Sequence, residues 1–354
     1  MKAARYYGKR DIRFEEIDVP KIKSDEALIK VKRCGICGTD LHEYVYGVQT
    51  LWFDRPHPLT GHMGPLVMGH EFSGVIEELG SELDHNRWHV GDRVCIMPLM
   101  HCGKCKYCRM GLEHLCEQFA ATGLQWPYGG FGEYVNVKEY QLRKLPDNVT
   151  FEQGACIEPL SLALYGLRRG NMQIGDKVLI TGAGPTAVLS LLGAKAAGAS
   201  EIYMSEVKPI RRQRCADWGA TEVFNPAEVS VPQEIMKRTE YGVDIAIDCS
   251  GNNSAMKDCF ASLRKRGTYV QSGLPVGEVT LPMFDFAYRD YNAVGLWCFN
   301  TYDFEQSIAL VEQGRIPVEK AVTKVVGVED TQKAFDELAD DAEGTNVKIQ
   351  ISFE

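Results

Sequence analysis

Between residues 177 and 297 the chain alternates short apolar segments with segments of helical periodicity, and this pattern constrains the fold more than any other feature. The apolar segments predict six strands, at residues 177–181, 201–205, 222–224, 243–248, 267–271 and 293–297. Strands that are separated by helices form a parallel sheet, because each crossover helix returns the chain to the same edge. The sequence therefore predicts an α/β fold with a six-stranded, doubly wound parallel sheet.

A glycine-rich turn follows the first of these strands and opens a predicted helix. It consists of Gly182, Ala183, Gly184, Pro185, Thr186 and Ala187. In a G-x-G-x-x-A turn the glycines let the backbone approach a pyrophosphate, and the N-terminus of the helix stabilises the phosphate charge. In this strand–helix context the pattern predicts a Rossmann fold that binds a dinucleotide. The alternative is a plain glycine-rich turn.

Glu206, at the end of the second predicted strand, bears on which dinucleotide is bound. A carboxylate at that position hydrogen-bonds a ribose 2′-hydroxyl and repels a 2′-phosphate. Lys208, Arg211 and Arg212 follow closely in the chain and act against this preference. We expect Glu206 and Arg211 to contact the cofactor, with NAD favoured over NADP. The alternative for Glu206 is a solvated side chain.

The residues on either side of the alternating region have a different character. In residues 1–154, apolar and β-branched runs alternate with glycine and proline turns, which predicts a β-rich domain. The last residues contain an amphipathic stretch at 302–314 and a strand-like segment at 348–353, and we expect them to rejoin that domain. The predicted division is therefore residues 1–154 with 298–354 in one domain and residues 155–297 in the other.

Charge and hydropathy exclude several classes of protein. A net charge of −9 disfavours nucleic acid as a partner, because binding a polyanion needs a dense cationic face. The longest weakly polar run, residues 181–199, contains Lys195, Pro185 and several glycines, so we expect no membrane span. The charged start does not resemble a secretory signal, and we expect a cytoplasmic protein. In a reducing compartment the 12 cysteines are expected to be metal ligands or buried thiols rather than disulfides.

Four cysteines are concentrated in residues 101–116. They are Cys102, Cys105, Cys108 and Cys116. The spacing departs from the bacterial iron–sulfur run at the fourth cysteine, and the surrounding glycine and lysines do not suit a redox C-x-x-C motif that opens a helix. A closed tetrahedral zinc site with four thiolates is favoured, and an iron–sulfur cluster or unligated thiols are the alternatives. A closed zinc site would stabilise a lobe but leave no position for a substrate.

Three motifs with metal-binding side chains lie outside this window. Residues 33–42 contain Cys37, Thr39 and His42, residues 68–74 contain His70 and Glu71, and residues 154–166 contain Glu158. Each motif has a simpler interpretation, since a cysteine is often a small buried side chain and a glutamate can cap a helix. In this order, with the four-cysteine window and the glycine-rich turn, the motifs resemble the zinc-dependent medium-chain dehydrogenase/reductase family over essentially the whole chain.

The resemblance implies a β-rich, GroES-like catalytic domain beside the Rossmann domain, and two zinc ions per chain. The ligands of the catalytic zinc would come from Cys37, His70, Glu71 and Glu158, with water or substrate completing the shell, and which of the two glutamates coordinates would vary with the state of the enzyme. Glu158 stands where alcohol dehydrogenases have a second cysteine ligand, which resembles the polyol, threonine and butanediol branch. Thr39 and His42 would relay the alcohol proton, and Asp40 would orient His70.

Further contacts follow from the same resemblance. The cofactor would also contact Ser272, Gly273, Leu274, Leu296 and Trp297, at the ends of the last two strands. The aromatic candidates for the substrate pocket are Tyr44, Trp52, Phe53 and Trp297, which could equally belong to the core. The resemblance also implies a homo-dimer or homo-tetramer formed through the nucleotide domains.

The implied activity is the zinc-dependent, reversible oxidation of a secondary alcohol or vicinal diol to the ketone or hydroxyketone, with hydride transfer to NAD. The favoured small-molecule substrates are 2,3-butanediol and acetoin. A sorbitol-type polyol, L-threonine or a simple alcohol is the alternative within this class. A non-catalytic, nucleotide-binding member of the family is the alternative from another class.

Overall fold

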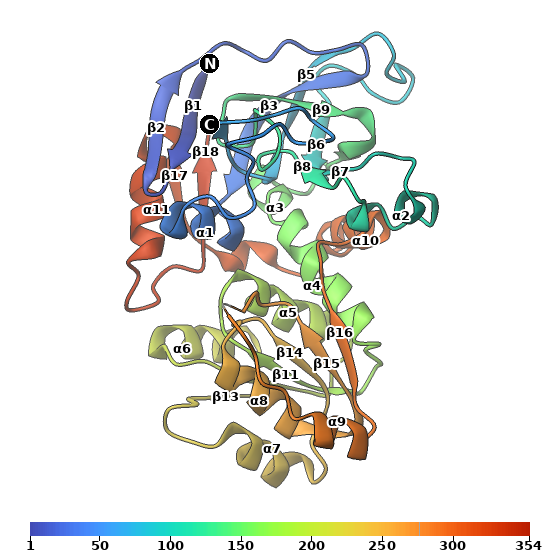
Figure 1. Ribbon diagram of the computed structural model, residues 1–354, viewed down its shortest axis with the longest axis vertical. Coiled ribbons are helices and arrows are strands. Elements are labelled where there is room, and N and C mark those ends of the chain that lie inside the picture. The colour runs from blue at the N-terminus through green and yellow to red at the C-terminus, as the bar shows by residue number, and fades with distance from the viewer. Residues whose placement is uncertain (276) are drawn as a thin grey trace.

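The computed structural model describes residues 1–275 and 277–354 and has two lobes, one above the other in Figure 1. The upper lobe contains both ends of the chain, and the lower lobe contains the parallel sheet. Helix α4 (Ile157–Arg169) runs between them (Figure 1). Among the described residues, no helix is both long and apolar enough to cross a membrane.

The upper lobe is built on a mixed sheet with the order β10-β6-β5-β3-β18-β17, and β9 also pairs with β3. Its strands are β3 (Glu26–Gly35), β5 (Glu71–Leu79), β6 (Arg93–Ile96), β9 (Tyr134–Lys138), β10 (Leu142–Lys144), β17 (Val322–Gly327) and β18 (Lys348–Ser352). A smaller sheet contains β1 (Lys2–Gly8), β2 (Asp11–Glu16) and β4 (Leu66–Val67). Because β18 pairs antiparallel with β3, the end of the chain returns to the first lobe.

The lower lobe contains a parallel sheet of six strands with the order β13-β12-β11-β14-β15-β16. The strands are β11 (Lys177–Thr181), β12 (Glu201–Ser205), β13 (Glu222–Phe224), β14 (Val243–Asp248), β15 (Leu263–Gln271) and β16 (Asn292–Gly295). The order reverses beside β11, so the sheet is doubly wound, and the predicted fold class is confirmed. Two expected boundaries were wrong. β15 starts earlier because Leu263 already pairs with Val243, and β16 ends before Trp297.

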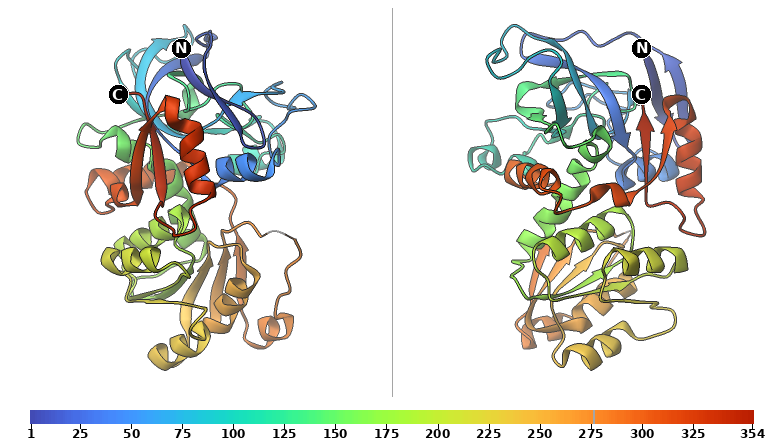
Figure 2. Two further views of the ribbon diagram at one scale, coloured as in Figure 1. Left: turned by 90° about the vertical axis from the view of Figure 1, so that its left-hand side faces the viewer. Right: turned by 180° about the vertical axis from the view of Figure 1, so that it is seen from behind.

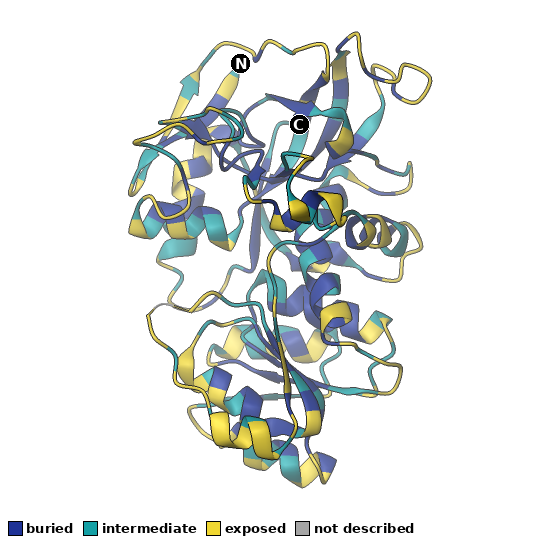
Figure 3. Cartoon of the chain, turned by 45° about the vertical axis from the view of Figure 1, so that its right-hand side comes forward, coloured by how far each residue is buried: buried dark blue, intermediate teal, exposed yellow. Residues whose placement is uncertain are grey.

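Helices cover both faces of this sheet (Figures 1 and 2). They are α5 (Pro185–Ala196), α6 (Pro209–Trp218), α7 (Val231–Thr239), α8 (Asn253–Ser262) and the short α9 (Met283–Tyr288). The sequence of α5 is apolar all round, because the helix packs between the sheet and α4. Figure 3 shows the buried residues gathered along this contact and the exposed residues on the outer helices.

Helix α4 is fixed to the upper lobe by helix α10 (Thr301–Glu312). Arg168 forms a bidentate ion pair with the buried carboxylate of Asp303, at 2.8 and 2.7 Å. Near the middle of the two helices, the hydroxyl of Ser161 donates to that of Ser307 at 3.1 Å. These bonds hold the start of α4, where Glu158 lies, against the metal-binding motifs of the first lobe.

Candidate metal and cofactor sites

Cys37, His70 and Glu71 come together in the upper lobe, and one ligand atom from each lies within 4.8 Å of the others. The register of the sheet explains this, because Gly35 at the end of β3 pairs with Glu71 at the start of β5. Cys37 is the N-cap of α1 (Gly38–Tyr46), two residues beyond β3, and His70 directly precedes β5. A single strand pairing therefore brings two distant motifs to one point.

Asp40 orients the imidazole of His70 from the first turn of α1. Its fully buried carboxylate accepts a hydrogen bond from the N–H of Cys37 at 3.1 Å and lies 3.4 Å from Nδ1 of His70. Burial alone would lower the pKa of His70, but Asp40 and Cys37 outweigh it and raise that pKa well above its usual value. With Nδ1 facing a carboxylate, Nε2 is the nitrogen left for a metal.

Glu71 has a second, tightly bound partner in Lys348, the first residue of β18. The ammonium donates to both carboxylate oxygens, at 2.7 and 2.6 Å, and to the carbonyl of Ile36 at 2.9 Å. Both side chains are 1% exposed. A Cβ on Gly35 would lie 2.2 Å from Oε2 of Glu71, so only glycine leaves room for this carboxylate. Glu71 thus belongs to the cluster and is also the counter-ion of a buried lysine.

Glu158, in the first turn of α4, is near enough to feel the charges of His70 and Glu71 but is not one of the three residues whose ligand atoms lie within 4.8 Å of one another. Burial raises its pKa to about 7, a shift that the nearby His70 opposes and Glu71 reinforces. Cys298 is close as well, since burial and then the charge of Glu158 raise the pKa of its thiol. A bound divalent cation would reverse the shift at Glu158, because it stabilises the carboxylate form.

The donor set of this cluster fits zinc. A thiolate, an imidazole and carboxylates are ligands that zinc accepts in catalytic sites, where fewer than four protein ligands leave a position for water or substrate. The oriented imidazole of His70 supports this fit, since ligating histidines commonly direct their other nitrogen at a carboxylate.

The four cysteines of the second motif also converge, with their sulfur atoms within 4.8 Å of one another. They lie on the loop around α2 (Lys106–Arg109), and all are free thiols. Backbone N–H groups of Cys102 and Gln118 point at the sulfur of Cys116, at 3.2 and 3.3 Å. Similar N–H groups lower the pKa of Cys105 to about 6. Four converging sulfurs with amide donors suit a closed zinc–thiolate site.

The expected cofactor turn lies at the carboxyl end of β11. Gly182 has a φ of +88°, a conformation that favours glycine, and its N–H donates to Ser205 at 2.8 Å. Gly184 caps α5, and a Cβ there would meet nothing within 4 Å. The space in front of the N-terminus of α5 is therefore open to an anionic group.

The other expected cofactor residues are distributed around this edge of the sheet. Glu206 is 7% exposed and accepts the N–H of Lys208 at 2.7 Å. The N–H groups of Ser272 and Gly273 donate to the carbonyl of Asp248, at 2.9 and 2.8 Å. Leu274 and Trp297 are exposed, and Leu296 is partly buried. Arg211 points to the loop before β18 and donates to the carbonyls of Gly344 and Asn346.

Comparisons with known proteins agree with this geometry. The matching family models are the alcohol dehydrogenase GroES-like domain, over residues 23–147, and the zinc-binding dehydrogenase, over residues 185–313. (R,R)-butanediol dehydrogenase of Bacillus subtilis is 36% identical over 352 residues, which is 99% of this chain and 99% of that protein. The chain belongs to the zinc-dependent medium-chain dehydrogenases.

Two further comparisons describe how the dehydrogenase relates to the family. Sorbitol dehydrogenase of Bacillus subtilis is 34% identical over 343 residues, covering 95% of this chain and 93% of that protein. The crystal structure of the 2R,3R-butanediol dehydrogenase from Bacillus subtilis matches with a TM-score of 0.93 and covers 100% of this chain and 99% of that chain. The family, the GroES-like and Rossmann-like fold and the oxidoreductase class expected from the sequence are thereby confirmed.

The aromatic candidates divide between the core and the space near the cluster. Tyr44 is fully buried and its hydroxyl donates to Asp336 at 2.8 Å, and Phe53 packs edge-on against Tyr6. Both therefore belong to the core of the upper lobe. Trp297 instead lies next to Cys298, and its ring meets that of Phe119 from the other lobe, with centroids 5.9 Å apart. This contact is part of the boundary between the lobes.

Sequence reasoning missed two residues of the dehydrogenase cluster. Lys348 begins a strand of alternating character, and a lysine at such a position ordinarily lies in solvent, so no local signal marks it as buried. Cys298 lies just beyond β16, where the chain has a φ of +49°, and the charge of Glu158 acts on its thiol. Only the folded chain brings these two residues near each other.

Replacing Lys348 by methionine is expected to destabilise the protein by about 3–5 kcal/mol, because Glu71 would remain buried without a counter-ion. Chemical unfolding of the metal-loaded protein measures this change. Lys324→Met is the matched control, since Lys324 lies on the adjacent strand β17 and pairs with Glu337 near the surface. The control should cost less than about 1 kcal/mol. Equal effects of the two substitutions would contradict the importance of the buried pair.

Proposed function

We propose that this dehydrogenase reversibly oxidises a secondary alcohol or vicinal diol to the ketone or hydroxyketone, with 2,3-butanediol and acetoin as its favoured substrates and NAD as its cofactor. The convergence of Cys37, His70 and Glu71, with Glu158 facing them, is the observation that carries the proposal. The 36% identity to a butanediol dehydrogenase over 99% of both chains supports the choice of diol.

The proposed ligands of the catalytic zinc are Cys37, His70 and one carboxylate at a time, from Glu158 or from Glu71, of which Glu71 is shared with Lys348. A zinc ion held there would lower the pKa of the substrate hydroxyl and polarise the ketone oxygen in the reverse direction. Asp40 keeps His70 in the orientation that presents Nε2. Carboxylate oxygens are harder ligands than thiolates. We therefore expect the metal in this site to exchange more readily than a metal held by four thiolates.

Proton movement is assigned to two residues of α1. Thr39 lies two positions after Cys37 and is partly exposed, so its hydroxyl can accept the proton of the substrate alcohol. His42 follows one turn later on the exposed side of α1 and can pass that proton to solvent. An imidazole can accept a proton at one ring nitrogen and donate one from the other.

The cofactor is assigned to the carboxyl edge of the parallel sheet. The open N-terminus of α5 suits a pyrophosphate, and Glu206 suits a ribose that lacks a 2′-phosphate. We assign residues 155–297 to the cofactor and residues 1–154 with 298–354 to the metal and substrate. We also propose a cytoplasmic location, because the 12 cysteines are thiols.

A panel of alcohols with NAD and NADP tests the proposed reaction. The wild-type enzyme should reduce NAD with a stereoisomer of 2,3-butanediol, and oxidise NADH with acetoin, at a kcat/KM at least about tenfold above those for sorbitol, L-threonine and simple alcohols. The 34% identity to a sorbitol dehydrogenase makes polyols the principal alternative. If the enzyme prefers a polyol, the proposed butanediol substrate is wrong and a polyol takes its place. If no alcohol is turned over, the chain is better explained as a nucleotide-binding protein without this activity.

Metal analysis combined with two cysteine variants separates the proposed zinc sites. We expect two zinc ions per chain in the wild type and one in either Cys37→Ser or Cys105→Ser. Cys37→Ser should abolish alcohol oxidation while the protein still binds NADH, because the residues assigned to the cofactor lie on the parallel sheet and do not include Cys37. Cys105→Ser should chiefly lower thermal stability. Normal turnover by Cys37→Ser would show that the proposed catalytic site is wrong.

We propose that two copies of the dehydrogenase pair through the outer strand of the parallel sheet. β16 ends the sheet order, and three of its four residues are exposed. An unpaired edge can hydrogen-bond the same edge of a second copy related by a two-fold axis. Exposed Met283 and Phe284 on α9 lie in the segment that leads into β16.

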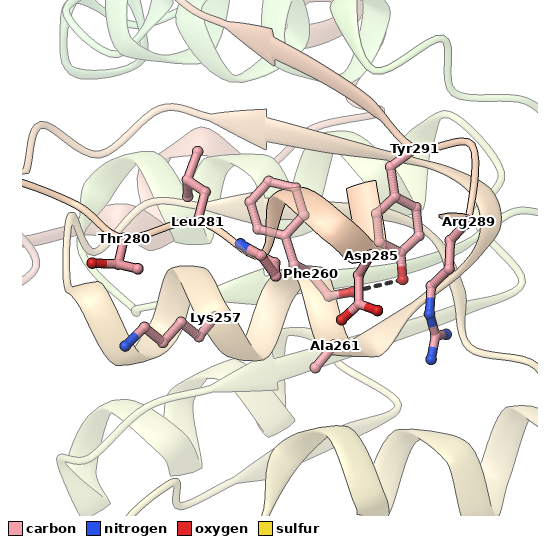
Figure 4. Close-up of a pocket in the computed structure, with 9 residues that line it drawn as sticks. Lys257, Phe260, Ala261, Thr280, Leu281, Asp285, Arg289 and Tyr291 are labelled. Atoms are coloured by element: carbon pink, nitrogen blue, oxygen red, sulfur yellow. Dashed lines mark hydrogen bonds between the residues drawn. The ribbon is translucent and has the colours of Figure 1, made fainter. Parts of the chain in front are cut away.

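A cavity of about 380 Å³ lies beside this edge, between α8 and the segment that contains α9 (Figure 4). Phe260 and Tyr291 form its inner wall, where the Tyr291 hydroxyl donates to the carbonyl of Phe260 at 3.0 Å. The exposed apolar residues around it would be covered by a second copy.

The mass in solution, measured by light scattering or sedimentation, tests this arrangement. The wild type should be a dimer or tetramer. Phe284→Glu should shift it toward smaller species, because a charge would be buried in the interface. Tyr241→Glu is the control, since Tyr241 is 69% exposed, against 80% for Phe284, and lies between α7 and β14, which β15 separates from β16. A monomeric wild type would exclude the proposed pairing.

A further inference from the structure

The loop between α11 (Thr331–Ala339) and β18 lies across helix α6 of the other lobe, and we call residues 341–346 the strap. The left view of Figure 2 shows this red loop reaching down to the helices of the lower lobe. Cations of α6 and its N-cap donate to main-chain oxygens of the strap. Lys208 bonds to Ala342, Arg211 bonds to Gly344 at 3.3 Å and Asn346 at 2.9 Å, and Arg214 bonds to Thr345 at 2.6 Å.

Hydrogen bonds within the strap fix its conformation. The carboxylate of Asp341, which is 6% exposed, accepts the N–H of Thr345 at 2.8 Å and the N–H of Asn346 at 2.9 Å. Gly344 has a φ of +76°, and a Cβ there would lie 3.0 Å from Nε of Arg211. The strap is therefore shaped by its own hydrogen bonds and fits closely against the cations of α6.

These cations are the ones that follow Glu206 in the chain. Glu206 accepts the N–H of Lys208, so its carboxylate lies at the N-terminus of α6. Arg212 donates to the main-chain oxygens of Glu206 and Val207, at 3.2 and 2.6 Å. Every lysine and arginine from 207 to 212 therefore donates its side chain to a carbonyl group. A cationic side chain in this part of a Rossmann fold is what accommodates a ribose 2′-phosphate.

We propose that the strap, together with Glu206, determines which cofactor is bound. The strap holds the side chains of Lys208 and Arg211 on its main-chain carbonyls. A 2′-phosphate would therefore meet the carboxylate of Glu206 and neither of these two cations in a free state. The inference rests on the proposed NAD-linked function. Removing the charge of Glu206 relieves repulsion, but Lys208 and Arg211 do not turn to hydrogen-bond the phosphate while they stay bound to the carbonyls of the strap. If Lys208 and Arg211 were also released from the strap, their side chains could form charge-assisted hydrogen bonds to the phosphate.

Two substitutions, alone and combined, test this inference. Glu206→Gln removes the carboxylate charge. Gly344→Ala strains the backbone and pushes a methyl group toward Arg211 and Lys208. Gly314→Ala is the matched control, because Gly314 also has a positive φ, +66°, but a Cβ there would meet nothing within 4 Å. Fluorescence titration with NADH and with NADPH gives the dissociation constants directly, and kcat/KM for both cofactors is measured beside them.

Each single substitution changes the dissociation constant of NADPH by some factor. The double variant Glu206→Gln/Gly344→Ala should bind NADPH at least about tenfold more tightly than the product of these two factors predicts. Glu206→Gln/Gly314→Ala should show no such coupling. Asp341→Ala, which removes the acceptor that shapes the strap, should reproduce the coupling with Glu206→Gln if the Gly344 variant does not fold.

Two other outcomes are decisive. If Glu206→Gln alone makes NADPH bind as tightly as NADH, and neither strap substitution adds to this, the strap has no part in cofactor choice and the proposal is wrong. If the wild type already binds NADPH more tightly than NADH, the proposed NAD-linked function is wrong. The two failures are distinguishable because the second is seen before any substitution is made.

Discussion

The buried contact between Lys348 and Glu71 joins the parts of the molecule on which the metal cluster depends. Lys348 belongs to the last strand, Glu71 to β5, and the carbonyl of Ile36, which Lys348 also bonds, follows β3. Two charges that are each 1% exposed are stable only as a pair, because burial of either alone costs several kcal/mol. The return of the chain to its first lobe thus completes the site as well as the sheet.

The same contact makes the surroundings of the two carboxylates, Glu71 and Glu158, different. Glu71 is held by a lysine on one side, whereas Glu158 has its pKa raised to about 7 by burial and faces His70 from another element. The two carboxylates are therefore not equivalent ligands. A metal at Cys37 and His70 would gain most from Glu158, because its charge would offset the burial that raises the pKa of that carboxyl, while Glu71 keeps its partner.

The Rossmann half was predictable because its signals are local. Each of the strands β11 to β14 follows from an apolar run of a few residues, and a positive φ at Gly182 is what the glycine turn requires. The cluster was predictable only through the order of the motifs, since Cys37, His70 and Glu158 are far apart in the chain. Lys348 could not be found at all, because its burial depends on the pairing of β18 with β3 and on the room that Gly35 leaves for the carboxylate of Glu71.

Val347 alone separates the strap from Lys348, and this short distance links the two proposed sites. On one side of Val347, Asn346 accepts from Arg211 of the nucleotide lobe. On the other side, Lys348 binds Glu71 in the metal cluster. The N–H of Val347 donates to the hydroxyl of Thr323 on β17 at 3.0 Å, so this residue is fixed by the sheet and cannot absorb a displacement freely. The residues that contact α6 and the residue that holds Glu71 are therefore neighbours in one segment that the sheet fixes in place.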